Sequence, residues 1–207
     1  QVEHPVTELV YGVDLVREQI HIAQGYAMRL SHEPLRPRGW ALECRITSED
    51  PANGFLPATG RVEYLRVPTG PGVRWDGGIE IGNDVTLFYD SLLGKVIVWG
   101  TDRGEAIRRM VRALRELVVS GVATNQAFHL RLLSDPEFLA SRIDSQFLDR
   151  RPDLLESPAD EARIATLAVA AALAEAESRQ GRRPLIQEES GAASRWIQAA
   201  RVEGLRS

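Results

Sequence analysis

Between residues 41 and 100 the chain breaks into short β-type segments separated by glycine and proline, and this pattern most limits its possible folds. Apolar Leu42, Cys44 and Ile46 alternate with Glu43 and Arg45, which is the two-residue period of a strand. Glu43 and Arg45 are therefore expected to share one outward face. Further strand candidates are residues 61–67, 73–75, 79–81, 85–88 and 96–99. Antiparallel strands joined by tight turns are the expected result.

Helical patterns flank these segments. Apolar residues at helical spacing predict one amphipathic helix over residues 6–23, with Gly25 as its stop. Asp102 and Glu105 form a capping box before a second stripe over residues 106–118, which Gly121 is expected to end. A shorter helix capped by Thr124 and a turn at residues 135–136 follow. The fold class predicted is α+β, with a small antiparallel sheet packed against helices.

The character of the chain changes near Arg151. Residues 157–160 read as a helix N-cap, followed by an alanine-rich helix to about Glu177. Residues 180–184 are expected to interrupt it, and a further helix is expected over residues 191–202. We therefore expect one domain at residues 1–150 and a helical extension or linker at residues 151–207.

Composition excludes several classes of protein. The 207 residues are 43% apolar with a net charge of −4, which is typical of a soluble globular chain. Cys44 is the single cysteine, so no internal disulfide can form, and a cytoplasmic location is expected. Residues 164–176 are too short an apolar stretch to cross a membrane. The histidines lack zinc-like spacing, which argues against a metal site made by this chain alone.

Nucleic acid is not an expected partner. The arginines at positions 108, 109, 112 and 115 fall on the polar side of a predicted helix with no aromatic platform beside them. Such a charged side is normally a solvated face. Separately, the chain starts at Gln1 without an initiator methionine, so we expect it to be part of a longer protein.

Two segments carry candidate chemistry. Residues 1–8 (QVEHPVTE) crowd an amide, a carboxylate and an imidazole before the first helix, where Glu3 could act as a base beside a bound oxyanion. Capping of the helix explains the same residues and is the more common case. Arg45 could stabilise a developing oxyanion, although an ion pair with Glu43 is the simpler interpretation. Residue types alone leave both pairs of alternatives open.

The basic residues are 24 arginines and one lysine, Lys95, which suggests that this position needs an ammonium, although one exception could be chance. Residues 88–95 end like a phosphate-binding loop, but Tyr89 and Val96 stand where a Walker A loop needs glycine and a hydroxyl residue. Residues 70–72 lack the third glycine of a dinucleotide fingerprint, and no G-x-S-x-G elbow occurs. These nucleotide and hydrolase motifs are excluded.

Taken together, several long motifs resemble the C-terminal domain of biotin carboxylase, an ATP-grasp enzyme, over Gln1 to about Arg150. They are QVEHPVTELVYGVDLVREQIHIAQG, RGWALECRITSEDP, FLPATGRV, PTGPGVRWD, FYDSLLGKVIVWG and GVATNQAFHLRLLSDPEF. The resemblance implies a ligase that uses ATP, Mg²⁺ and bicarbonate to carboxylate biotin through carboxyphosphate. This is the first half-reaction of acetyl-CoA, propionyl-CoA and pyruvate carboxylases, and it implies a biotin carboxyl carrier, a carboxyltransferase and a homodimeric or larger assembly as partners.

Roles follow for the matching residues. By resemblance, Glu3 is the catalytic base that deprotonates bicarbonate, while Gln1 and the Val2 backbone hold that anion. Arg45 is the second catalytic residue: it binds bicarbonate and biotin and stabilises the enolate-like form of biotin, which overrides the simple ion-pair interpretation. Lys95 keeps a structural role only, and Arg74 is expected to support the structure or a dimer contact.

The chain differs from the usual sequence of the family at Trp40, at residues 47–48 and at residues 58–59. These differences are expected to affect packing and loops, not the assignment to the family. The family's nucleotide-binding domain and magnesium-binding glutamates would lie before Gln1, so the chain alone is expected to be inactive. The alternative is a non-catalytic assembly or dimerisation module derived from this family. The acyl acceptor stays open among acetyl-CoA, propionyl-CoA, other acyl-CoA esters and pyruvate.

Overall fold

A computed structural model describes residues 1–30, 34–155 and 161–181, and these divide between two compact units, Gln1–Pro158 and Ala159–Ser207. In the first unit the helices are α1 (His4–Tyr11), α2 (Leu15–Ala23), the 3-10 turn η1 (Pro51–Asn53), α3 (Arg103–Glu116), α4 (Gln126–Leu132), α5 (Pro136–Leu139) and α6 (Pro152–Leu155). Its strands are β1 (Trp40–Thr47), β2 (Glu49–Asp50), β3 (Leu56–Pro57), β4 (Gly60–Arg61), β5 (Tyr64–Arg66), β6 (Val73–Gly77), β7 (Asp84–Val85), β8 (Leu92–Gly100) and β9 (Val118–Ser120).

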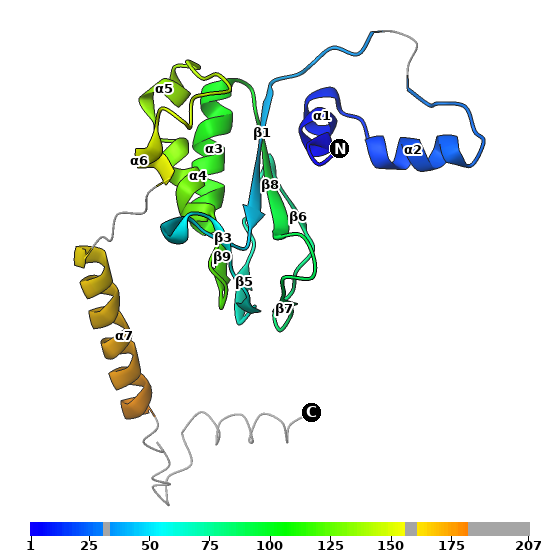
Figure 1. The fold of residues 1–207 in the computed structure, drawn as a ribbon. Coiled ribbons are helices and arrows are strands. Elements are labelled where there is room, and N and C mark those ends of the chain that lie inside the picture. The colour runs from blue at the N-terminus through cyan, green and yellow to red at the C-terminus, as the bar shows by residue number, and fades with distance from the viewer. Residues whose placement is uncertain (31–33, 156–160, 182–207) are drawn as a thin grey trace, which may run out of the picture. The chain divides into compact units, whose positions relative to one another are not determined.

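The central sheet has the antiparallel order β1-β8-β6, and β2–β3, β4–β7 and β5–β9 form small antiparallel pairs around it. Figure 1 shows α3 on one side of this sheet and α1 on the other. The predicted α+β class with a small antiparallel sheet packed against helices is confirmed.

The sheet has two chemically different faces because side chains alternate along each strand. On β1, Cys44 and Ile46 turn toward α3 and join the main hydrophobic core, together with Val96 and Val98 of β8 and Met110 of α3. The intervening positions form the opposite face, where Glu43 and Arg45 stand beside Lys95. Burial of this apolar face stabilises the unit, because apolar surface removed from water contributes roughly 25 cal/mol per Å².

The prediction of one continuous helix over residues 6–23 is wrong, because the structure has two helices there, α1 and α2. Gly12 has φ +68°, a left-handed conformation that ends α1, and the Asp14 side chain then accepts a hydrogen bond from the Arg17 N–H to begin α2. The helical spacing of apolar residues continues across this break, so the spacing alone could not predict that the helix ends at Gly12. Glycine at such a φ is the residue that ends a helix most readily.

Several other boundaries also differ. The second long helix is confirmed with its Asp102 cap but ends at Glu116, and residues 118–120 leave it to pair with β5 as β9. Asn125, not Thr124, precedes α4. Residues 79–81 form no strand in the part of the chain that the structure describes, because they lead directly into a turn at residues 81–82, where Gly82 has φ +91°. The strand predicted at residues 96–99 is longer, Leu92–Gly100, so Lys95 lies inside β8.

α1 is fastened to the sheet by Arg74 on β6. Its Nη1 donates to Glu8 Oε2 at 2.6 Å, while its Nε and Nη2 donate to Asp76 Oδ1 and Oδ2 at 2.7 Å each. Glu8 is buried, and its other oxygen accepts from the Leu15 N–H at 2.9 Å, which also ties α1 to α2. These hydrogen bonds raise the pKa of Arg74, so the guanidinium stays charged. Arg74 thus has the supporting role expected of it.

Beyond α4, the chain stays attached to the first unit through Arg151 and α6. Arg151 pairs with the buried Asp135 and with Asp153, and Leu154 is buried. In the second unit the structure describes α7 (Glu161–Gly181), which presents Leu167, Val169 and Leu173 to solvent. The alanine-rich helix is therefore present, and it continues to Gly181, so the interruption predicted from residue 180 is wrong for its first two residues. Residues 182–184, the predicted cap at 157–160 and the helix at 191–202 lie outside the described residues. The division at Arg151 into two domains stays a prediction.

Candidate functional site

Glu3 and Arg45, which are 42 residues apart, meet in the structure. Arg45 Nη2 lies 3.3 Å from Glu3 Oε2, and both side chains are more than half exposed, at 51% and 57%. Glu3 precedes α1 but makes no capping hydrogen bond with a described residue of that helix. Its carboxylate points to the guanidinium instead, so the capping interpretation of Glu3 is wrong. An exposed carboxylate beside a fixed cation can bind and deprotonate a small acid.

The other predicted anion-binding residues lie nearby. Gln1 and Glu3 line a cleft of about 310 Å³ with His4 and Thr7 of α1. The Gln1 carbonyl accepts from His4 Nδ1 at 2.9 Å, which folds the start of the chain back onto α1. Arg45 is not among the residues that line this cleft and reaches Glu3 from the sheet instead.

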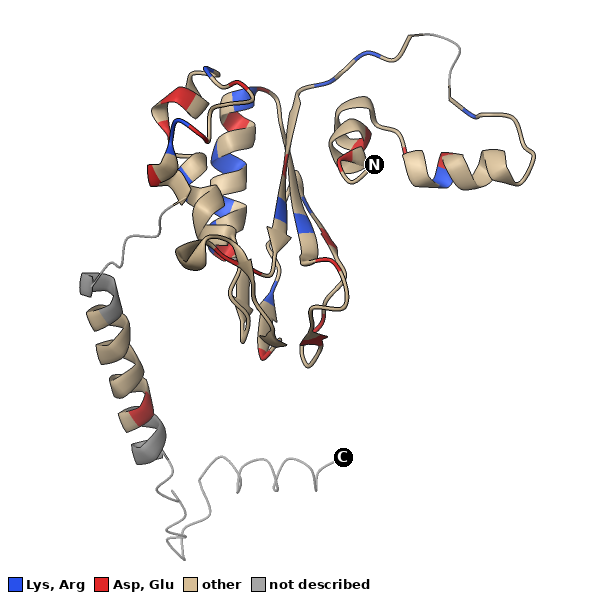
Figure 2. Cartoon of the chain, viewed as in Figure 1, with Lys and Arg blue, Asp and Glu red and all other residues tan. Residues whose placement is uncertain are grey.

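Val2 contributes through its main chain. Lys95 Nζ donates to the Val2 carbonyl oxygen at 3.1 Å, and Lys95 is only 9% exposed in β8. Figure 2 shows basic residues on the neighbouring strands β1 and β8 and acidic residues on α1. The single lysine of the chain therefore holds the segment that carries the candidate base.

Glu43 differs from the outward residue that strand alternation suggests. Its side chain is only 6% exposed, and its Oε1 lies 3.7 Å from Arg45 Nε. Burial raises the pKa of Glu43, and the charges of Lys95 and Arg45 oppose that rise. The predicted ion pair between Glu43 and Arg45 is thus present, but Arg45 also reaches Glu3.

The backbone of Arg45 is held from the side of α4. Its carbonyl oxygen accepts from Asn125 Nδ2 at 3.0 Å and from His129 Nε2 at 2.9 Å. The Thr47 N–H donates to Asn125 Oδ1 at 3.1 Å. Because a carbonyl only accepts, His129 carries its proton on Nε2, and burial lowers the pKa of its ring. These contacts fix the end of β1 from which the guanidinium extends.

Sequence reasoning missed Glu43 as a buried partner and both Asn125 and His129 as anchors. The segment GVATNQAFHLRLLSDPEF was recognised as a motif, but no spacing rule connects it with a strand some 80 residues earlier. Lys95 was the one residue with a usable signal, because it is the only lysine.

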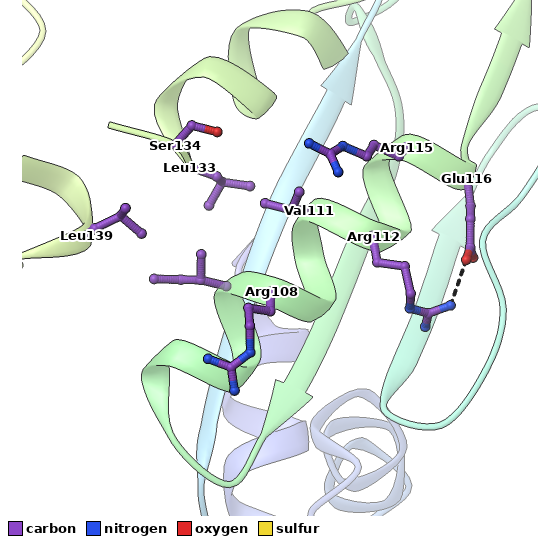
Figure 3. A pocket seen from close by; sticks show the side chains of 9 residues that line it. Arg108, Val111, Arg112, Arg115, Glu116, Leu133, Ser134 and Leu139 are labelled. Carbon is purple, nitrogen blue, oxygen red and sulfur yellow. Dashed lines mark hydrogen bonds and ion pairs between the residues drawn. The ribbon is translucent and has the colours of Figure 1, made fainter. Parts of the chain in front are cut away.

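A larger groove lies on the other side of the central sheet, between α3 and the segment that follows α4. Figure 3 shows Arg108, Arg112 and Arg115 along α3, with the apolar side chains of Val111, Leu133 and Leu139 beside them. The groove has a volume of about 710 Å³. Arg112 pairs with Glu116 at 2.8 Å. This groove contains neither Glu3 nor Arg45 and is not part of the candidate site.

Within residues 1–30, 34–155 and 161–181, no group of three His, Cys, Asp or Glu residues is placed to hold a metal ion. No described helix is long and apolar enough to cross a membrane.

The fold and the site together describe an α+β domain with a carboxylate and a guanidinium paired at the edge of its sheet. Comparison with known proteins shows which family this domain belongs to. The biotin carboxylase C-terminal domain family matches residues 43–150. The biotin carboxylase of Nostoc sp. is 50% identical over 148 residues, covering 72% of this chain and 33% of that protein. The mitochondrial propionyl-CoA carboxylase alpha chain of Homo sapiens is 44% identical over 156 residues, 74% of this chain and 21% of that protein.

A solved structure agrees. The biotin carboxylase domain dimer of Hydrogenobacter thermophilus 2-oxoglutarate carboxylase, in complex with ADP, its magnesium salt and bicarbonate, superposes with a TM-score of 0.73. Its sequence is 39% identical, with 76% of this chain and 35% of that chain covered. The chain belongs to the biotin carboxylase C-terminal domain family. It spans about a third (33%) of the length of bacterial biotin carboxylases that it matches.

Proposed function

We propose that this chain is part of a biotin carboxylase, a ligase that carboxylates biotin with ATP and bicarbonate. The observation that carries this proposal is the approach of Arg45 Nη2 to within 3.3 Å of Glu3 Oε2 at an exposed edge of the sheet. Family membership supports it, and so does the bicarbonate complex of the 2-oxoglutarate carboxylase domain.

In the proposed reaction Glu3 accepts the proton of bicarbonate. The Arg45 guanidinium, which does not lose its charge in proteins, holds the anion beside Glu3 and stabilises negative charge on oxygen. Gln1 and the Val2 main chain complete the anion site. ATP, when bound with Mg²⁺, would activate the bicarbonate, and we propose that residues outside this chain hold that nucleotide.

Biotin fits the same edge of the sheet. Biotin supplies the ureido nitrogen that accepts the carboxyl group, and its ureido oxygen is an acceptor for the half-exposed guanidinium fork of Arg45. Arg45 thus contacts bicarbonate and biotin in turn.

The proposed partners are a biotin carboxyl carrier, a carboxyltransferase and a second copy of the carboxylase. Relatives named propionyl-CoA carboxylase alpha chain and pyruvate carboxylase, and the domain dimer named above, support them. A role in acetyl-CoA carboxylase, and thereby in fatty acid synthesis, is one option within this proposal, as is a cytoplasmic location.

The test is bicarbonate- and biotin-dependent release of ADP by the longer protein that carries this chain. Wild type should turn over, while Glu3→Gln and Arg45→Ala should each lose at least about 100-fold in kcat/KM. Arg115→Met on α3 is the matched control and should keep the wild-type rate. A folded parent protein without turnover, or full activity in both variants, would reject the catalytic proposal and leave an assembly module.

A further inference from the structure

The buried groups behind the Glu3–Arg45 pair have no role in the proposed reaction so far. Lys95 and Glu43 lie on the face of the sheet that α1 covers, at 9% exposure for Lys95 and 6% for the Glu43 side chain. Burying charged groups is costly unless they are paired, so their presence here needs a reason.

Lys95 makes a specific contact. Its Nζ donates to the Val2 carbonyl at 3.1 Å, one residue before the carboxylate that meets Arg45. A hydrogen bond from a buried ammonium to that carbonyl fixes the peptide that joins Val2 to Glu3, which limits where the Glu3 side chain can point. The chain otherwise uses arginine for every basic position, and only a compact ammonium on a long stem provides a point contact of this kind.

Glu43 acts on the other member of the pair. Its Oε1 lies 3.7 Å from Arg45 Nε, while Nη2 of the same guanidinium lies 3.3 Å from Glu3 Oε2. Its Oε2 is buried without a hydrogen-bond partner among the described residues. The charges of Lys95 and Arg45 are the largest favourable influences on this carboxylate.

We propose that Lys95 and Glu43 are positioning residues: Lys95 holds the Val2–Glu3 peptide, and Glu43 holds the Arg45 guanidinium, so that base and cation face one bicarbonate. This inference rests on the proposed function and deepens it. Neither residue touches the reacting atoms. Lys95 acts through Val2, and Glu43 acts through Arg45.

The experiment uses the longer carboxylase that carries this chain and measures bicarbonate-dependent ATP hydrolysis at varied bicarbonate and varied ATP. Lys95→Met should raise the KM for bicarbonate by about tenfold or more, because a small displacement of a reacting group is costly, while the KM for ATP changes by less than about twofold. Lys95→Arg should recover part of the loss by restoring the charge. Arg115→Met, which also removes one cation, should leave both constants unchanged.

Glu43→Gln keeps the shape of the side chain and removes its charge. It should lower kcat/KM for both bicarbonate and biotin by about tenfold without changing the KM for ATP. A purely structural role would instead lower the amount of active enzyme and leave every KM at its wild-type value.

A second measurement does not depend on turnover. Deuterium uptake by residues 1–8 should be faster in Lys95→Met than in wild type or Arg115→Met, because the Val2 carbonyl has lost its anchor. If Lys95→Met does not fold, Lys95→Arg and Glu43→Gln decide the question by the same KM comparison. Wild-type KM values for bicarbonate in the folded variants would overturn the positioning roles while the proposed function stands. Absence of turnover in folded wild type would reject the proposed function itself.

Discussion

Arg45 and Lys95 lie directly opposite each other on the neighbouring antiparallel strands β1 and β8. Like charges in that relationship repel, and the strands tolerate them because each cation has its own oxygen partner. Arg45 meets Glu3 and Glu43, whereas Lys95 meets the Val2 carbonyl. One cross-strand pair thus brings three separate segments of the chain to one place.

Arg74→Met should detach α1 from the sheet. The substitution leaves the buried Glu8 carboxylate without its 2.6 Å partner, and the free energy of unfolding should fall by about 2 kcal/mol. Urea unfolding of the chain followed by circular dichroism measures this change. The double variant with Glu8→Gln should lose less than the two single losses together, whereas strict additivity would contradict the pairing.

Asn125→Ala should loosen the end of β1. The buried amide donates to the Arg45 carbonyl and accepts from the Thr47 N–H, so its removal should cost about 2 kcal/mol of unfolding free energy. Deuterium exchange at Thr47 should become faster at the same time. Gln146→Ala, at an exposed position, is the control, and equal exchange at Thr47 in both variants would show that Asn125 does not hold the strand.

The stability of the folded chain should depend on pH through His129. Burial lowers the pKa of its imidazole below the ordinary 6.5, so below that pH the unfolded chain binds a proton that the folded chain does not. The stabilisation linked to this difference is complete above pH 6.5 and is lost as the pH falls. Melting temperatures of wild type and His129→Gln, measured from pH 8 to pH 5, should approach each other on acidification. A constant difference across the series would refute the assignment.

Cys44 should resist alkylation in the folded chain. Its side chain faces the core, and burial raises the pKa of the thiol to about 12 from an ordinary 9.0. Iodoacetamide labelling at pH 8 should therefore be at least about 1000-fold slower than for an exposed thiol, since the thiolate is the reactive form. Ser145→Cys supplies an exposed comparison in the same chain. Equal labelling of both cysteines, counted by mass spectrometry, would place Cys44 at the surface.

The local parts of the fold were predictable and the long-range parts were not. The alternation at residues 41–46 and the helix cap at Asp102 are contained in a few consecutive residues, and both appear in the structure. The second half of the capping box differs, because the Glu105 carboxylate accepts from the Thr101 N–H instead of the Asp102 N–H. By contrast, residues 118–120 continue a helical apolar period, and their pairing with β5 depends on a segment more than 50 residues away. The burial of Glu43 depends in the same way on α1, which packs over β1 from a distant part of the chain.

The same distinction between local and long-range features applies to the candidate site. Residue types alone favoured capping for Glu3 and an ion pair with Glu43 for Arg45, and the resemblance to the biotin carboxylase family was needed to place the two together. Their roles in catalysis stay predictions, although the structure brings the two side chains to 3.3 Å.

One face of β1 packs in the core and the other carries the charged residues of the candidate site. A shift of the strand in register would therefore disrupt both the core and the site. A single inserted residue between Leu42 and Arg45 would turn the apolar side chains toward α1 and carry the charged ones into the core. Such an insertion would therefore abolish folding and activity together. A library of insertions along β1 should therefore yield no soluble protein that is merely inactive, whereas point substitutions on the charged face should.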